Sequence, residues 1–288
     1  MDSLVANAVR PDLRRSTDST EDTKHFIDLE AFGDSAAYKL PLYWEEAVRM
    51  YTKDTLLKYG YVPYHIIYMK NKLTEAFRQR NADSILFYAA DLGHYIEDAN
   101  VPLHTSLNYD GQLTNQKGLH SLWESTVPEL ELTNYNLSSK HKAKYLAHPE
   151  EEIMNTIRRT NSLLPDVFAK EKELSATFAD TAKYVVRPSR NGGTYKSYSP
   201  AFAKAYAASL KNTVNDQLIH ASNLVADFWY TSWVDAGAPD LNDLIQPPYT
   251  RGDKKMFRKT YKSFRKNKLI SDSLLIAKQP YRARKAAE

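Results

Sequence analysis

Two pairs of a histidine and a carboxylate carry most of the chemical information in this sequence. His94 and Asp98 are four residues apart, His120 and Glu124 repeat that spacing, and His104 lies between the pairs. On an α-helix, side chains at positions i and i+4 lie on one face, so each pair can reach one metal ion. Imidazole and carboxylate ligands without thiolate are typical of catalytic rather than structural zinc sites. The pattern therefore predicts a metallohydrolase.

One such pair alone would be better explained by an internal hydrogen bond between a buried histidine and a buried carboxylate. The repeated spacing and the additional histidine favour metal binding over that alternative. The sequence contains no Gly-x-Ser-x-Gly motif, no phosphate loop, no dinucleotide fingerprint and no cysteine, so other catalytic systems are not indicated. Four other histidines lack such company and are interpreted as ordinary helix or surface residues: His65, His141, His148 and His220.

The composition sets further bounds. With 42% hydrophobic residues in 288, the chain can bury a substantial core. The absence of cysteine excludes disulfides and thiolate metal sites. No apolar run approaches the ~18 residues of a membrane span, so no transmembrane helix is predicted.

The C-terminal segment is strongly basic. Residues 251–288 contain 13 Lys or Arg and 3 Asp or Glu, a net charge of +10 within a chain of net charge +4. Phe257, Tyr261 and Phe264 recur there at helical spacing. Such a segment could contact an anionic surface or phosphates, or it could be a solvated helix with one apolar stripe.

The pattern of apolar residues is helical throughout, and only nine glycines occur. Pro63 is placed to open one helix, and Asn81 or Asp83 to cap the helix that carries His94. Helices are predicted over about 43–58, 63–80, 83–99, 116–127, 149–163, 167–184 and 200–230. We therefore expect an all-α, single-domain helical bundle over 25–245, preceded by a loosely ordered segment over 1–24 and followed by a basic tail with a helical pattern over 246–288.

The context of the histidines resembles a known family. Gly-His94-Tyr-Ile-Glu-Asp98-Ala-Asn-Val-Pro-Leu-His104 is followed by Gly-Leu-His120-Ser-Leu-Trp-Glu124. This arrangement resembles the superfamily of bacterial zinc-dependent phospholipases C and the single-strand-specific zinc nucleases of fungi and plants. The resemblance covers about residues 8–235, whose end is similar to a branch common in environmental bacteria. It implies an all-α bundle with the metals in a central cleft.

The resemblance also implies ligands, residue by residue. Asp12 in Pro-Asp-Leu-Arg-Arg and His25 in Lys-His-Phe-Ile-Asp resemble upstream ligands of the family. Seven residues would then bind two zinc ions, the first held by Asp12, His25, His94 and Asp98, and the second by His104, His120 and Glu124.

The family's third zinc has no complete counterpart here. It is bridged by the residue that matches Asp98 and is otherwise held by an N-terminal Trp and a nearby His. In this sequence no Trp precedes Trp44 and no His precedes His25. We therefore expect two zinc sites and reduced or lost activity. A shortened gene model or a truncated copy is the simplest explanation, and a two-zinc variant is the alternative.

The implied function is hydrolysis of a phosphodiester by a metal-bound hydroxide, with Asp12 and Asp98 as catalytic carboxylates. Glu124 favours the phospholipase C-like branch, since the nucleases more often carry Asp there. A single-strand-specific nuclease is the alternative, and a truncated, non-catalytic copy is a third. The substrate would be a phospholipid or single-stranded nucleic acid. The resemblance implies a secreted or periplasmic protein, although the sequence as given carries no signal peptide.

Overall fold

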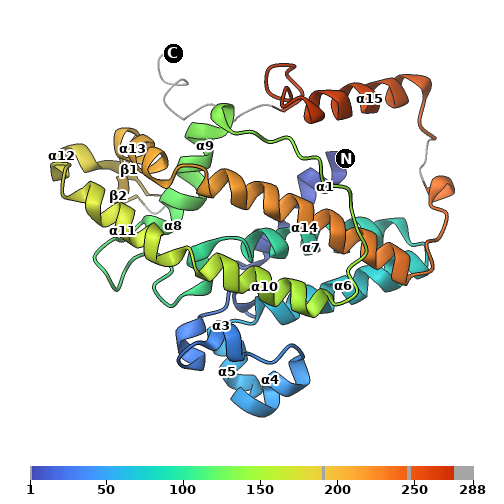
Figure 1. Cartoon of the computed structure of the whole chain (residues 1–288), viewed down its shortest axis with the longest axis horizontal. Helices are drawn as coiled ribbons and strands as arrows, with labels where there is room; N and C mark the ends of the chain where they lie inside the picture. Colours follow the sequence, from blue (N-terminus) through green and yellow to red (C-terminus); the bar gives the residue numbers. More distant parts are fainter. Residues whose placement is uncertain (1, 190–191, 245–247, 276–288) are drawn as a thin grey trace. The chain divides into compact units, whose positions relative to one another are not determined.

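The protein is all-α in a computed structural model that describes residues 2–189, 192–244 and 248–275. A single two-stranded hairpin is the exception among these residues (Figure 1). The chain forms two compact units, each assembled from separate stretches. Unit 1 comprises residues 1–107, 139–162 and 218–258, and unit 2 comprises 108–138, 163–217 and 259–288. Among the described residues, no helix combines the length and the apolar character that a membrane crossing requires.

Unit 1 is built from helices and short 3-10 turns. Its elements are α1 (Asp2–Asn7), α2 (Arg10–Arg14), η1 (Asp22–Lys24), η2 (Leu29–Phe32), α3 (Ala36–Lys39), α4 (Trp44–Tyr51), α5 (Lys53–Tyr59), α6 (Val62–Arg78), α7 (Ala82–Asp98), η3 (Pro102–Thr105), α10 (Pro149–Asn161) and η6 (Asn242–Leu244).

The core of unit 1 surrounds α7, which packs along α6. The Asn81 side chain caps α7 by accepting a hydrogen bond from the Ser84 N–H, as the sequence predicts. Leu92 and Ile96 are fully buried on one face of the helix. The Trp229 indole, from the later part of α14 (Thr213–Asp235), donates to the Ala89 carbonyl at 3.0 Å. Helix α7 is therefore held both by α6 and by Trp229 of α14.

The N-terminal segment differs from the sequence-based expectation. Loose order was predicted over 1–24, whereas the structure contains α1, α2 and η1 there. The physical reason is a pair of long-range ion pairs: Arg10 and Arg14 both reach Asp91 on α7. Sequence patterning does not reveal such contacts, because the partners are about 80 residues apart.

Unit 2 contains the hairpin and the remaining helices. Its elements are α8 (Leu119–Ser121), a π-helical turn (Leu122–Thr126), α9 (Val127–Glu131), η5 (Leu132–Asn134), α11 (Leu164–Ser175), α12 (Asp180–Lys183), β1 (Tyr184–Pro188), β2 (Thr194–Tyr198) and α13 (Pro200–Leu210). The strands are antiparallel, with Tyr184 opposite Tyr198. The prediction of a single helix over 167–184 is wrong in its second half. In the structure α11 ends at Ser175, and the chain continues into the short helix α12 and then into strand β1.

Two other predicted helices are interrupted. The segment 43–58 divides into α4 and α5 at Thr52, which has a φ of 65°. The segment 200–230 divides into α13 and α14 at Lys211, which has a φ of 54°. A positive φ cannot continue a right-handed helix. Of the predicted tail 246–288, residues 246–247 and 276–288 lie outside the described residues, and α15 covers Arg251–Arg265.

Candidate metal centre

Unit 1 brings together five of the seven predicted ligands. Asp12 lies on α2, His25 caps the end of η1, His94 and Asp98 lie one turn apart on α7, and His104 lies on η3. Three separate stretches of the chain therefore supply the side chains of one site.

The backbone around His25 is fixed by hydrogen bonds to two neighbouring segments. The Ile27 N–H donates to the His104 carbonyl at 2.9 Å, and the Val62 N–H donates to the Phe26 carbonyl at 3.1 Å. The turn before α6 passes so close that a Cβ on Gly60 (φ 85°) would lie 2.3 Å from the Phe26 oxygen. Glycine is thus required at that approach, which holds His25 beside α7.

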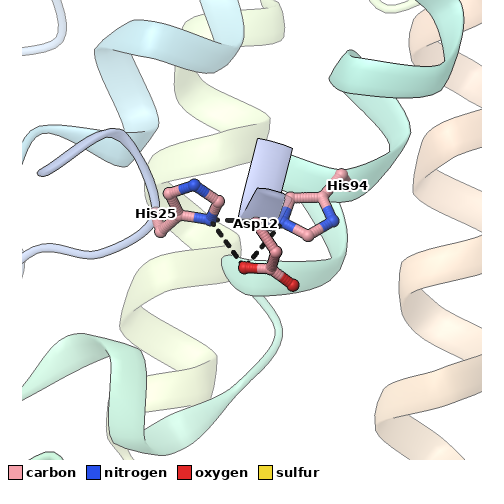
Figure 2. A group of neighbouring side chains, drawn as sticks. All are labelled: Asp12, His25 and His94. Carbon is pink, nitrogen blue, oxygen red and sulfur yellow. Dashed lines mark hydrogen bonds and ion pairs between the residues drawn. The ribbon is translucent and has the colours of Figure 1, made fainter. Parts of the chain in front are cut away.

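Four potential ligand atoms converge from these elements. The His25 Nδ1 lies 2.8 Å from the Asp98 Oδ2 and 3.1 Å from the His94 Nε2. The His94 Nε2 lies 3.3 Å from the same Asp98 oxygen. The Asp12 Oδ1 lies 3.9 Å from the His25 Nδ1 and 3.8 Å from the His94 Nε2, and Figure 2 shows this carboxylate facing both rings.

This spacing lets His25 and His94 bind one metal ion together with a carboxylate oxygen. Ligands at about 2.0–2.1 Å from zinc in tetrahedral geometry are about 3.3 Å from one another. The separations that join the two histidine nitrogens to each other and to the two carboxylates, 2.8 to 3.9 Å, bracket that value. The ligand atoms of Asp12, His25 and His94 all lie within 4.8 Å of one another. Two imidazole nitrogens and two carboxylate oxygens are also a donor set that zinc accepts. The residues present therefore fit the ion that the resemblance implies.

The two carboxylates of the site differ in exposure and in reach. The side chain of Asp12 is 52% exposed, whereas those of His25 and Asp98 are 3% and 7% exposed. Solvent therefore reaches this group of ligands from the Asp12 side. Asp98 also uses both oxygens, because its Oδ1 lies 3.3 Å from the His104 Nδ1. Asp98 thus faces His25 and His94 with one oxygen and His104 with the other.

A buried glutamate that the sequence analysis missed lies behind His25. The Glu21 side chain is 1% exposed, and its Oε1 lies 3.6 Å from the His25 Nε2. Lys24 donates to the Glu21 Oε2 at 2.7 Å, and the Tyr95 hydroxyl and Arg14 donate to its Oε1. Burial alone would raise the pKa of Glu21, but these donors outweigh it and lower the pKa to about 2. Glu21 therefore presents a negative charge to the outer nitrogen of His25.

A second buried carboxylate joins the elements that carry the ligands. Asp91 lies one turn before His94 on α7 and is 1% exposed. The Arg14 Nη2 lies 2.7 Å from Asp91 and 3.1 Å from Glu21. This guanidinium therefore ties α2, which carries Asp12, both to α7 and to the turn of His25. In the sequence, Glu21 lies four residues before His25 and Asp91 lies three residues before His94. This spacing could have indicated that both carboxylates lie near the ligands.

The second predicted pair lies in unit 2. The His120 Nε2 is 2.6 Å from the Glu124 Oε2, and the two side chains are 30% and 39% exposed. The i, i+4 spacing places them together although the helix changes to a π-helical turn at Leu122. The His120 N–H also donates to the Asp110 carboxylate at 3.4 Å. Since His104 belongs to unit 1, the second zinc site that combines it with this pair stays a prediction.

The other histidines have structural surroundings. His65 is 8% exposed among aromatic rings, and its burial lowers its pKa to about 3. The His220 Nδ1 lies 2.8 Å from the Asn100 Oδ1, and the His141 Nε2 lies 2.7 Å from the Asp227 Oδ1. These contacts explain the three residues without a metal ion.

No protein-family model matches the chain, and no curated protein matches it. The functional interpretation therefore depends on the motif resemblance and on the geometry of the residues themselves.

Proposed function

We propose that the protein is a zinc-dependent phosphodiester hydrolase, similar to the phospholipases C. One observation carries this proposal: in unit 1 the ligand nitrogens of His25 and His94 lie 3.1 Å apart, and carboxylate oxygens of Asp12 and Asp98 lie 2.8 to 3.9 Å from them. The motif resemblance names the same four residues as ligands of one zinc ion. The motif resemblance and the separations of the ligand atoms thus support the same metal site.

The residues of the site have separable roles in this proposal. His25 and His94 would hold the ion through Nδ1 and Nε2, the nitrogens that face one another. The Asp98 Oδ2 faces the same two nitrogens, and the Asp98 Oδ1 faces the His104 Nδ1. A bound zinc ion supplies Lewis acidity, which lowers the pKa of a water ligand and offsets charge on a phosphoryl oxygen. The exposed Asp12 carboxylate would bind the ion or accept the proton that water loses as its oxygen attacks phosphorus. The P–O bond to the alcohol then breaks, and the alcohol leaves with a proton from solvent.

The first experiment is the zinc content of the purified chain, measured by elemental mass spectrometry after preparation without chelator. We expect at least one zinc ion per chain, and two if His104, His120 and Glu124 form the second site. The His94→Ala variant should lose the first ion, whereas His148→Ala, which changes an exposed histidine, should keep it. A folded wild-type protein without bound zinc would refute the proposal.

Activity assays then separate the substrate classes. A choline phospholipid and single-stranded DNA are supplied in parallel to the zinc-loaded protein. Release of the phosphorylated head group supports the phospholipase C-like function, and cleavage of DNA supports the nuclease. A zinc-loaded protein that cleaves neither substrate would support a non-catalytic copy.

A further inference from the structure

An aromatic cavity in unit 1 is lined by none of the four residues that the proposed function assigns to the first zinc ion. It has a volume of about 590 Å³, within the usual range for small-molecule sites. Its walls come from the first turn of α4, one face of α6, the start of α10 and the turn before His25. The residues that define it are Trp44, Tyr61, Tyr64, His65, Tyr68 and Glu150.

The rings form a continuous wall. Trp44 lies 5.5 Å from Tyr61 and 5.7 Å from Tyr64, measured between ring centroids. His65 lies 5.8 Å from Tyr61 and stacks on Tyr68 at 5.7 Å. The face of an aromatic ring is electronegative and attracts cations, most strongly for Trp and Tyr. Tyr68 already does so within the chain, because the Lys72 ammonium lies 5.3 Å from its centroid.

The charged groups that line the cavity also favour a positively charged ligand. Glu45 and Glu150 line it as carboxylates. Each also lies in the first turn of a helix, where it offsets the helix dipole. The one lining lysine, Lys24, is neutralised by Glu21 at 2.7 Å and faces Asp18 at 3.5 Å. Burial keeps His65 uncharged at neutral pH by lowering its pKa.

We propose that this cavity binds an organic ammonium ion, whose positively charged N-alkyl groups pack on the faces of the rings in the field of Glu45 and Glu150. An anion would meet two carboxylates there. A neutral apolar molecule would use the rings but not the charge. The ligand class therefore follows from rings and carboxylates that share one cavity.

The test uses the full chain in the presence of a chelator, so that its outcome does not depend on zinc or on the proposed activity. Benzyltrimethylammonium is titrated into the protein by isothermal calorimetry. The neutral analogue 2-methyl-1-phenylpropan-2-ol, which has nearly the same shape, is titrated in parallel. We expect saturable binding of one ammonium ion per chain and binding of the alcohol that is at least about fivefold weaker, the contribution of one cation–π contact.

Two variants locate the binding. Tyr68→Leu removes a ring and keeps an apolar side chain, and Glu150→Gln removes a charge at a partly exposed position. Tyr68→Leu should weaken binding by about fivefold, the contribution of one cation–π contact. Glu150→Gln should weaken it by about two- to fivefold, as expected for a partly exposed charge pair. Tyr249→Leu and Glu151→Gln make the same changes at exposed positions outside the cavity and should leave binding unchanged. Equal binding of the alcohol, equal loss in the control variants, or no saturable binding of the ammonium ion would overturn the proposal.

Discussion

The charge of Glu21 offers a sharp test of how the first metal site is held. Glu21→Gln keeps the size and shape of the side chain and removes its negative charge. The His25 Nδ1 faces the other ligands, so its Nε2 must carry the proton if Nδ1 is to bind a metal. Glu21 lies on that side, 3.6 Å from Nε2. A carboxylate in this position fixes the tautomer and raises the basicity of the ligating nitrogen.

The expected magnitude follows from this distance. Loss of an outer partner of a ligating histidine typically weakens metal binding by about 10- to 100-fold. At 3.6 Å the contact is longer than a normal hydrogen bond, so the lower limit applies. We therefore expect zinc to bind Glu21→Gln about tenfold more weakly, which corresponds to about 1.4 kcal/mol.

Zinc affinity is measured by competition with a chromophoric chelator at neutral pH. The unfolding of the zinc-free variant is followed separately, because a glutamine amide next to Lys24 and Arg14 also loses charge-assisted hydrogen bonds. Asp22→Asn is the matched control, since Asp22 is 58% exposed and pairs with Arg15 at the surface. A folded Glu21→Gln protein with wild-type zinc affinity, or an equal loss in Asp22→Asn, would contradict the proposed role. A wild-type chain that binds no zinc would instead refute the metal site itself.

Three further predictions concern stability and are measured by denaturant unfolding in the presence of a chelator. Arg14→Met should lower the free energy of unfolding by about 3 kcal/mol, because the buried Asp91 loses its closest counter-charge; a loss below about 1 kcal/mol would show that Arg10 suffices. Burial lowers the pKa of His65 to about 3, so the unfolded chain binds a proton that the folded one does not, and stability is lost as the pH falls below about 6.5. Between pH 7 and pH 5 the free energy of unfolding should fall by about 2 kcal/mol because of His65 alone, and the His65→Phe variant should lack this contribution. Leu92→Ala should cost about 3 kcal/mol because Leu92 is fully buried, whereas Leu86→Ala, at 36% exposure, should cost less than about 1 kcal/mol.

The sequence was informative where local signals act within one helix. Asn81 caps α7, and apolar spacing identifies the face that carries Leu92 and Ile96. The i, i+4 spacing of His94 and Asp98 places both side chains on one turn, and the structure has their ligand atoms 3.3 Å apart. Such features depend on residues a few positions apart, which a sequence displays directly.

Other features depend on tertiary contacts or on backbone conformations that residue type does not specify. Thr52 and Lys211 interrupt predicted helices with positive φ, although neither is a glycine. The strands β1 and β2 are short and partly exposed, so their alternation is weak. Glu21 and Asp91 looked like ordinary charged residues, and only the contacts with Arg14 reveal their burial.

The wide separation of the ligands along the chain has a consequence for biosynthesis. His25 and Asp98 are 73 residues apart in sequence, and His25 and His94 are 69 apart. A growing polypeptide therefore holds only fragments of the site until the end of α7 has left the ribosome. An ion that binds the assembled site but not these fragments acts as a clamp on a long loop and stabilises only the correctly folded chain. Metal capture would then follow the docking of α2 and His25 on α7, while unit 1 still awaits residues 139–162 and 218–258.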